Sequence, residues 1–244
     1  MAKDPRKAAE KLLRKAEKAA RKARKAADRA ETAAAAPAAA AAAKAGPLVS
    51  PLAPAEFPEL PAIAGVEFAA GAAGIKYKDR TDVMLVRLAP GTAIAGAFTR
   101  SSTRAACVLD CQDKLAGNPG SDQGAAIVVN SGNANAFTGA AGQRSVDAVT
   151  GAVARALGVP ARRVFSSSTG VIGEPLPHER ITAILDDLAG GLDEGGIASA
   201  ARAIMTTDTF PKGAGAEIAA EGGSIRIAGI AKGSGMIAPD MATM

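Results

Sequence analysis

Short apolar runs rich in β-branched residues recur along the chain and predict strands. These runs are residues 82–88, 95–99, 105–109, 125–130 and 163–168. Two further runs, 216–220 and 224–231, flank Glu221-Gly222-Gly223 and predict a hairpin. The chain beyond residue 65 is therefore rich in short strands.

A second pattern, with apolar residues every three or four positions, predicts helices. The helical segments are residues 144–157, 178–189 and 195–205. In the first of them Val146, Val149 and Val153 share one face, and Gly158 follows as a residue type that ends helices. Strands and helices mixed without strict alternation predict an α/β fold. We expect a layered sandwich of mixed sheets and helices rather than a doubly wound sheet.

The first 64 residues follow neither pattern. Residues 1–46 are a basic extension rich in Ala, Lys and Arg, and Leu12 and Leu13 are its only adjacent large apolar residues. Without an apolar stripe the extension has no surface with which to pack against a core, so we expect a solvated segment, helical or disordered. Residues 47–64 contain five prolines and predict an extended lead-in to a body that spans residues 65–244.

Charge is divided unevenly between these parts. The chain carries a net +5, but residues 1–46 hold thirteen Lys and Arg against five Asp and Glu, hence +8 there and −3 in the remainder. A nucleic acid would therefore bind only weakly, through the extension. No secretory signal is evident, and no apolar run approaches the roughly 20 residues that span a bilayer. We expect a cytoplasmic protein without a membrane anchor.

Metal and disulfide chemistry find little support in the sequence. Cys107 and Cys111 are the only cysteines and His178 is the only histidine, too few for a four-ligand zinc site. We expect reduced thiols and no metal. A lone histidine at a predicted helix start also leaves no Ser/His/Asp triad.

Residues 166–177 form the first candidate for chemistry. A strand that ends in Ser168-Thr169-Gly170 can aim backbone N–H groups and a hydroxyl at one point, as an oxyanion hole requires. A phosphate-binding nest is the competing interpretation, although Gly-Lys-Ser/Thr and GxGxxG are absent. Residues 130–139, NSGNANAFTG, are a further loop of small polar residues, but Asn and Gly are typical of tight turns, so the sequence favours an ordinary loop there.

The second candidate combines residues 206–213 with the C-terminal stretch KGSGMIAPDMATM. It offers three hydroxyls, and two cations for a carboxylate substrate, on Thr206, Thr207, Thr209, Lys212 and Lys232. If acyl chemistry occurs, the base must be something other than histidine. A threonine at a new N-terminus would supply one, because an α-amine has a pKa of about 7.7–8.0.

Residues from about 50 to 244 resemble the α half of a known family, the bifunctional ornithine acetyltransferase/glutamate N-acetyltransferases of arginine biosynthesis. The matching stretches occur in the same order and at sensible spacing. They are GVEFAAGAAGIKYKDRTDVMLV, AGAFTRS, VVNSGNANAFTG, SSTGVIGEPLP, AIMTTDTFPK and IAKGSGMIAPDMATM. The resemblance implies the layered fold of self-processing enzymes with an N-terminal nucleophile.

The resemblance also assigns a nucleophile and a processing site. In this family the precursor is cut between Ala and Thr of the final motif, here Ala242 and Thr243. Thr243 would then be the nucleophile and a substrate contact at the start of a β chain. We therefore expect this chain to be the α-chain portion, ending just past the processing site. The expected partner is the β chain of the same precursor, in a heterotetramer or larger assembly.

Other roles are carried over residue by residue. Thr169 and Gly170 would form the oxyanion hole, and Thr209 and Lys232 would contact the amino-acid substrate. The implied reaction moves acetyl from N²-acetylornithine to glutamate through a covalent ester. It needs no metal or redox cofactor, and the resemblance leaves open whether acetyl-CoA is a second donor.

Two alternatives use the same residues differently. A self-processing aminopeptidase or amidase would employ the same nucleophile with water as the acceptor. A non-catalytic binding protein would instead use the basic extension to hold anionic partners.

We expect deletion of residues 1–46 to leave the thermal midpoint of the body nearly unchanged, because the extension lacks an apolar stripe. Differential scanning calorimetry of the full and shortened chains measures this. A fall of more than a few degrees would mean that the extension packs on the body.

Overall fold

The computed structural model describes residues 49–117, 120 and 122–241. The described residues from Ser50 onward belong to one compact unit. The expected extension, residues 1–46, and the expected processing site at Ala242 and Thr243 lie outside the described residues.

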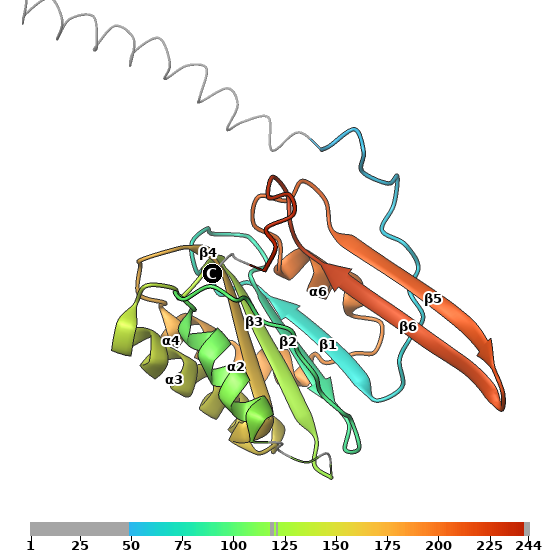
Figure 1. Cartoon of the computed structure of the whole chain (residues 1–244), viewed down its shortest axis with the longest axis horizontal. Helices are drawn as coiled ribbons and strands as arrows, with labels where there is room; N and C mark the ends of the chain where they lie inside the picture. The colour runs from blue at the N-terminus through green and yellow to red at the C-terminus, as the bar shows by residue number, and fades with distance from the viewer. Residues whose placement is uncertain (1–48, 118–119, 121, 242–244) are drawn as a thin grey trace, which may run out of the picture. The chain divides into compact units, whose positions relative to one another are not determined.

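A four-stranded mixed sheet forms the centre of this unit (Figure 1). Its strands lie in the order β1 (Val66–Gly71), β2 (Val83–Leu88), β3 (Ala125–Asn133) and β4 (Val164–Val171). The β1–β2 and β2–β3 pairs are antiparallel, whereas β3 and β4 are parallel. Helix α3 (Gly139–Leu157) makes the crossover that a parallel pair requires.

Helices cover both faces of the sheet. They are α2 (Ala106–Ala116), α3, α4 (His178–Thr182), α5 (Leu185–Gly190) and α6 (Ile197–Ala203). Val83 and Leu85 of β2 pack in one cluster with residues of α3, α4 and α5, while Met84 and Val86 pack on the other face with α6. Burial on both faces explains the unbroken apolar run of β2. The expected α/β fold of layered sheets and helices is confirmed.

Two predicted strands are wrong. Residues 105–109 belong mainly to helix α2, because Cys107 and Cys111, four residues apart, are buried on one helical face against β4. Residues 95–99 have no regular secondary structure and are partly or fully exposed, with no strand beside them to complete a ladder.

Other elements differ in extent. The helix predicted at 178–189 is split into α4 and α5 around Ile184, although Ile181, Leu185 and Leu188 are still buried in one cluster. Strand β1 has no counterpart among the predicted elements. The predicted hairpin is present and longer, as β5 (Lys212–Ala220) and β6 (Gly223–Ala231).

The carboxyl ends of β3 and β4 approach each other closely. Their register shifts at Gly132 and Asn133, and Asn133 pairs with both Thr169 and Val171. Gly170 has φ +135° at this point, and a Cβ placed on it would lie 2.4 Å from the carbonyl carbon of Gly132. The irregular pairing therefore requires glycine at this position.

Replacing Gly170 by Ala should lower the free energy of unfolding by at least about 3 kcal/mol, since it adds a backbone clash to an unfavourable φ. Gly173→Ala is the matched control, because Gly173 has φ +82° but nothing lies within 4 Å of the place that a Cβ would occupy. It should cost only about 1–2 kcal/mol. Urea unfolding measures both, and equal losses would show that the close approach contributes nothing.

Candidate active site

A cleft of about 990 Å³ opens at the carboxyl ends of β3 and β4. Its walls come from these strand ends, from the loop between β1 and β2, from the start of α2, and from the loops after α6 and β6. Lining residues include Ser131, Gly132, Thr169, Gly170, Thr206 and Lys232. Strand ends of this kind are where open α/β sheets commonly place ligands.

Lys232 joins two walls of the cleft through its ammonium group. Its Nζ donates to Thr169 Oγ1 at 2.9 Å and to Thr206 Oγ1 at 2.8 Å. Because an ammonium group can only donate, both hydroxyls must act as acceptors toward it. Each hydroxyl therefore keeps its own proton for another acceptor. At Thr169 that acceptor can be an oxygen developing negative charge in the cleft.

Asp208 fixes the loops that carry these groups. Its side chain is fully buried, and Oδ1 accepts from Lys212 Nζ at 2.7 Å and from the Gly233 amide at 2.6 Å. Its Oδ2 accepts from the Thr206 amide at 3.1 Å. One carboxylate thus holds the residue after Lys232 and the backbone of Thr206.

The ionisation of Asp208 reflects these contacts. Burial acts to raise its pKa, but the hydrogen bond from Lys212 and those from the Gly233 and Thr206 amides outweigh burial and lower the pKa to about 2. Asp208 is therefore charged throughout the physiological range, and its role is to position rather than to exchange protons.

Arg80 also binds the loop after α6, which carries Thr206. Its guanidinium donates to the carbonyl oxygens of Met205 and Thr206. Asp82, which also lines the cleft, has both carboxylate oxygens occupied by the backbone amides of Ala73 and Ile75. The charges of Arg80 and Lys232 consequently favour an anionic group such as a substrate carboxylate.

Buried polar side chains hold the strand ends beneath Thr169. Asn130 Oδ1 accepts from Ser168 Oγ at 2.7 Å, and Asn130 Nδ2 donates to the Asn133 carbonyl at 2.9 Å. Asn130 is 3% exposed, so these bonds are shielded from water. The residue preceding Thr169 is thereby tied to the irregular end of β3.

Of the four predicted site residues that the structure describes, three lie together. Thr169, Gly170 and Lys232 all line the cleft. Thr209 lies elsewhere, since its Oγ1 accepts from the Ser50 amide at 3.1 Å, and Thr206 and Thr207 line the cleft instead. The substrate-binding role of Thr209 stays a prediction.

Other candidate side chains have structural partners. Lys212 is paired with Asp208, and its Nζ lies 4.3 Å from the Phe210 ring centroid. His178 Nδ1 lies 3.1 Å from Ser145 Oγ, away from the cleft lining. Neither side chain therefore lines the cleft.

The cysteines also have structural settings. Cys107 forms part of the cleft wall, but burial raises the pKa of its thiol and disfavours the reactive thiolate. Both cysteines are free. Across the described ranges, no cluster of three or more His, Cys, Asp or Glu side chains could hold a metal ion. Nor does any helix in those ranges have the length and apolar character to cross a membrane.

Sequence reasoning missed Asp208, Arg80 and Asn130. Asp208 is the one acid in TTDTFPKG, and an acid among hydroxyls beside a lysine was a usable signal. Arg80 and Asn130 gave no comparable signal, because their partners are remote in sequence or on the backbone.

Comparison with known proteins identifies the family. Residues 67–244 match the ArgJ family model. The chain belongs to the ArgJ family. The arginine biosynthesis bifunctional protein ArgJ of Ruegeria pomeroyi is 64% identical over 190 residues, which is 78% of this chain and 46% of that protein. The Gluconobacter oxydans protein of the same name is 52% identical over 187 residues, 77% of this chain and 43% of that protein.

Solved structures of ArgJ proteins agree with the fold. Ornithine acetyltransferase from Mycobacterium tuberculosis, complexed with ornithine, is 38% identical with a TM-score of 0.65, covering 72% of this chain and 92% of that chain. ArgJ from Bacillus halodurans is 32% identical with a TM-score of 0.64, and the match covers 71% of this chain and 89% of that chain. This ArgJ chain spans about half the length of the curated relatives. The resemblance drawn from the motifs is confirmed.

Replacing Asp208 by Asn should lower the free energy of unfolding by about 2 kcal/mol at pH 7, because the lowered pKa of Asp208 stabilises the folded state. A lowered folded pKa gives stability that is complete above the ordinary value near 3.8 and is lost as pH falls toward 2. Urea unfolding from pH 7 to 3 should therefore show a gap that is constant to about pH 5 and roughly halved by pH 3.

Glu174→Gln serves as the control, since Glu174 pairs with Lys76 at the surface with 55% of its side chain exposed. That change should cost under about 1 kcal/mol. A gap for Asp208→Asn that persists unchanged to pH 3 would show that its carboxylate does not titrate in this way.

Proposed function

We propose that this chain is part of an acetyltransferase of arginine biosynthesis. It would act in the cytoplasm with a second polypeptide, equivalent to the remaining half of its relatives, in a heterotetramer or larger assembly. The acetyl group moves from N²-acetylornithine to glutamate. The observation that carries this proposal is the pair of hydroxyls, Thr169 and Thr206, held as acceptors by Lys232 in the cleft of an ArgJ-family chain. The ornithine complex of the Mycobacterium tuberculosis neighbour supports the substrate class.

The first half-reaction forms an ester. The Oγ of Thr243, freed as an N-terminal residue, attacks the acetyl carbonyl while its own α-amine takes the hydroxyl proton. The carbonyl oxygen gains negative charge, and the Thr169 hydroxyl donates to it beside Gly170. The amide C–N bond then breaks, and ornithine leaves with the proton from the α-amine.

The second half-reaction returns the nucleophile. The glutamate amine attacks the ester carbonyl, the ester C–O bond breaks, and the proton from the amine passes to Thr243 Oγ through the α-amine. Lys232, together with Thr209, would bind the amino-acid substrate. Acyl transfer of this kind needs no cofactor, and acetyl-CoA would serve only as a second acetyl donor.

We further propose cleavage between Ala242 and Thr243, since an acylated nitrogen cannot act as the base. The backbone before this bond supports the idea, because Ala238, Asp240 and Met241 have φ of 47°, 54° and 59°. Each such residue costs roughly 1–2 kcal/mol, which cleavage can release.

Contacts and comparisons support the same idea. The Met241 carbonyl accepts from the Arg100 amide at 2.6 Å and from Thr99 Oγ1 at 3.0 Å, so the strained segment is held in place. The match to this chain covers 92% and 89% of the two solved ArgJ chains, but less than half of the two curated proteins. The solved chains are therefore much shorter than the curated proteins. Chains of that shorter length suit a processed protein.

The test is acetyl transfer by this chain co-expressed with the C-terminal half of the Ruegeria pomeroyi relative, begun at the threonine aligned with Thr243. Thr169→Val removes the hydroxyl at nearly constant volume and should lower kcat by about 10²–10³ with little change in KM. Thr169→Ser retains the hydroxyl and should stay within about tenfold of the parent. Release of ornithine and formation of acetylglutamate are measured.

Other outcomes identify other functions. Hydrolysis of peptide amides without transfer to glutamate would indicate an amidase. No turnover, together with heparin retention that requires residues 1–46, would indicate a binding protein. A normal kcat with a raised KM in Thr169→Val would make Thr169 a substrate contact instead.

A further inference from the structure

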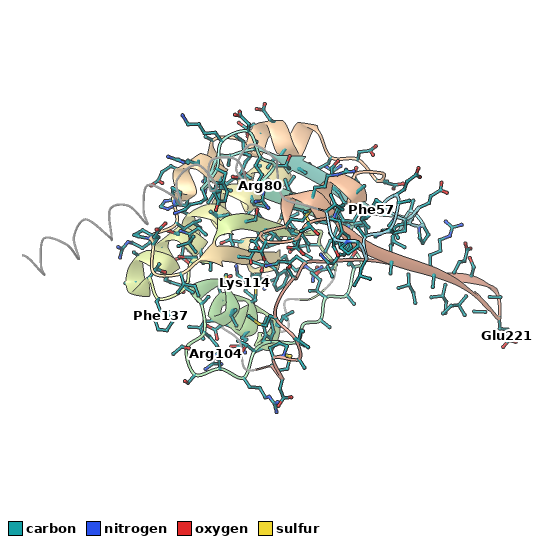
Figure 2. The ribbon with its side chains drawn as sticks, turned by 90° about the horizontal axis from the view of Figure 1, so that it is seen from above. Phe57, Arg80, Arg104, Lys114, Phe137 and Glu221 are labelled. Atoms are coloured by element: carbon teal, nitrogen blue, oxygen red, sulfur yellow. The ribbon has the colours of Figure 1, made fainter. Side chains whose placement is uncertain are left out.

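The β5–β6 hairpin is a two-stranded sheet, separate from the four-stranded one. Figure 2 shows it extending away from the body, with Glu221 at its tip and Phe57 near its root. Hairpins of two strands are marginally stable alone, so something must support one of this length. Part of that support is visible at the root, where Gly213 and Gly215 lie against Phe57 and Leu60.

The register divides the hairpin into two unlike faces. Directly opposed residues share a face, and one face carries the pairs Glu217–Arg226 and Ala219–Ser224. Here Ser224 Oγ donates to Glu217 Oε1 at 2.7 Å, and Arg226 Nε lies 3.4 Å from the same oxygen. We call this outer part of the face the polar face, and it is suited to water.

The opposite face is apolar along its length. Apart from Lys212 at the root, it consists of Ala, Gly and Ile, and we call it the apolar face. Its residues are Ala214, Ala216, Ile218, Ala220, Gly223, Ile225, Ile227, Gly229 and Ala231. Ile218, Ile225 and Ile227 are 50%, 54% and 51% exposed. Contiguous exposed isoleucines opposite a satisfied polar face are typical of a surface that another polypeptide covers.

We propose that the apolar face is the docking surface for the polypeptide equivalent to the second half of the ArgJ relatives. This inference rests on the proposed function for the existence of that partner. The length of the relatives supports this occupant, since the matched region is only 46% and 43% of two of them. The hairpin lies inside the family match, and its uncharged face fits a partner that presents an apolar sheet surface.

Docking there would bear directly on the cleft. Strand β6 ends at Ala231, one residue before Lys232, and β5 begins at Lys212, which is bound to Asp208. A partner that covers the apolar face therefore restrains both strands that lead to the cleft. Docking would therefore reinforce the hold that Asp208 already has on the loops around the cleft.

The experiment co-expresses the full chain with the tagged C-terminal half of the Ruegeria pomeroyi relative and measures how much chain is recovered with the tag. Ile218→Thr/Ile225→Thr alters a directly opposed pair on the apolar face while keeping β-branched residues. Recovery should fall at least about tenfold because the buried apolar area is lost. The matched control is Glu217→Thr/Arg226→Thr, the adjacent opposed pair on the polar face, which should stay within about twofold.

A second variant guards against misfolding. Ile227→Thr alone should give an intermediate loss, and circular dichroism of each isolated chain should match the parent. Equal recovery of parent and Ile218→Thr/Ile225→Thr would overturn the docking surface while leaving the proposed function intact. Equal loss in the polar-face control would overturn the assignment to the apolar face.

Two further outcomes bear on the occupant. Failure of the parent chain to recover with the tagged half would overturn both this inference and the two-polypeptide function. Self-association that Ile218→Thr/Ile225→Thr abolishes, with recovery by the tagged half unchanged, would assign the face to a second copy and overturn the proposal.

Discussion

The geometry of the cleft depends on one buried carboxylate. Asp208 has a fully buried side chain, and it accepts from an ammonium group and two backbone amides. Burying a charge is costly unless it is paired and hydrogen-bonded, and here it is. The same bonds tie together the loop after α6, the root of β5 and the loop after β6. Asp208 holds Gly233, the residue after Lys232, and also the backbone of Thr206. Lys232 can therefore reach the hydroxyls of Thr169 and Thr206 at once.

The central sheet supplies a second constraint. Because helices cover most of both faces, the cleft lies where β3 and β4 end. The close approach of Gly170 to Gly132 places such an end beside the two loops. Asn130 then sets the direction of the strand through buried hydrogen bonds. Fold and cleft therefore share the same residues.

Local pattern was sufficient for much of the fold and insufficient for the site. Strand β2 and helix α3 were predictable because continuous apolar runs and a 3.6-residue period report burial directly. Residues 105–109 misled because a short apolar run has no visible period, and only the spacing of Cys107 and Cys111 marks the helix. Lys232 and Thr169 are 63 positions apart, and Arg80 reaches a carbonyl 126 positions away. Such contacts follow from the fold alone. Thr169 and Lys232 were therefore assigned to the site through the family motifs, and Arg80 was missed.

The amphipathic hairpin has a consequence for how such a protein is made in the cell. A ribbon with an uncovered row of isoleucines is a hazard for aggregation for as long as that row stays exposed. If both polypeptides are translated as one precursor, they are produced in equal numbers. Each polypeptide is also covalently linked to the other during synthesis, which gives an effective concentration of about a millimolar. Synthesis as a single chain would then protect the hairpin from aggregation, because the two polypeptides would separate only after the apolar face is covered.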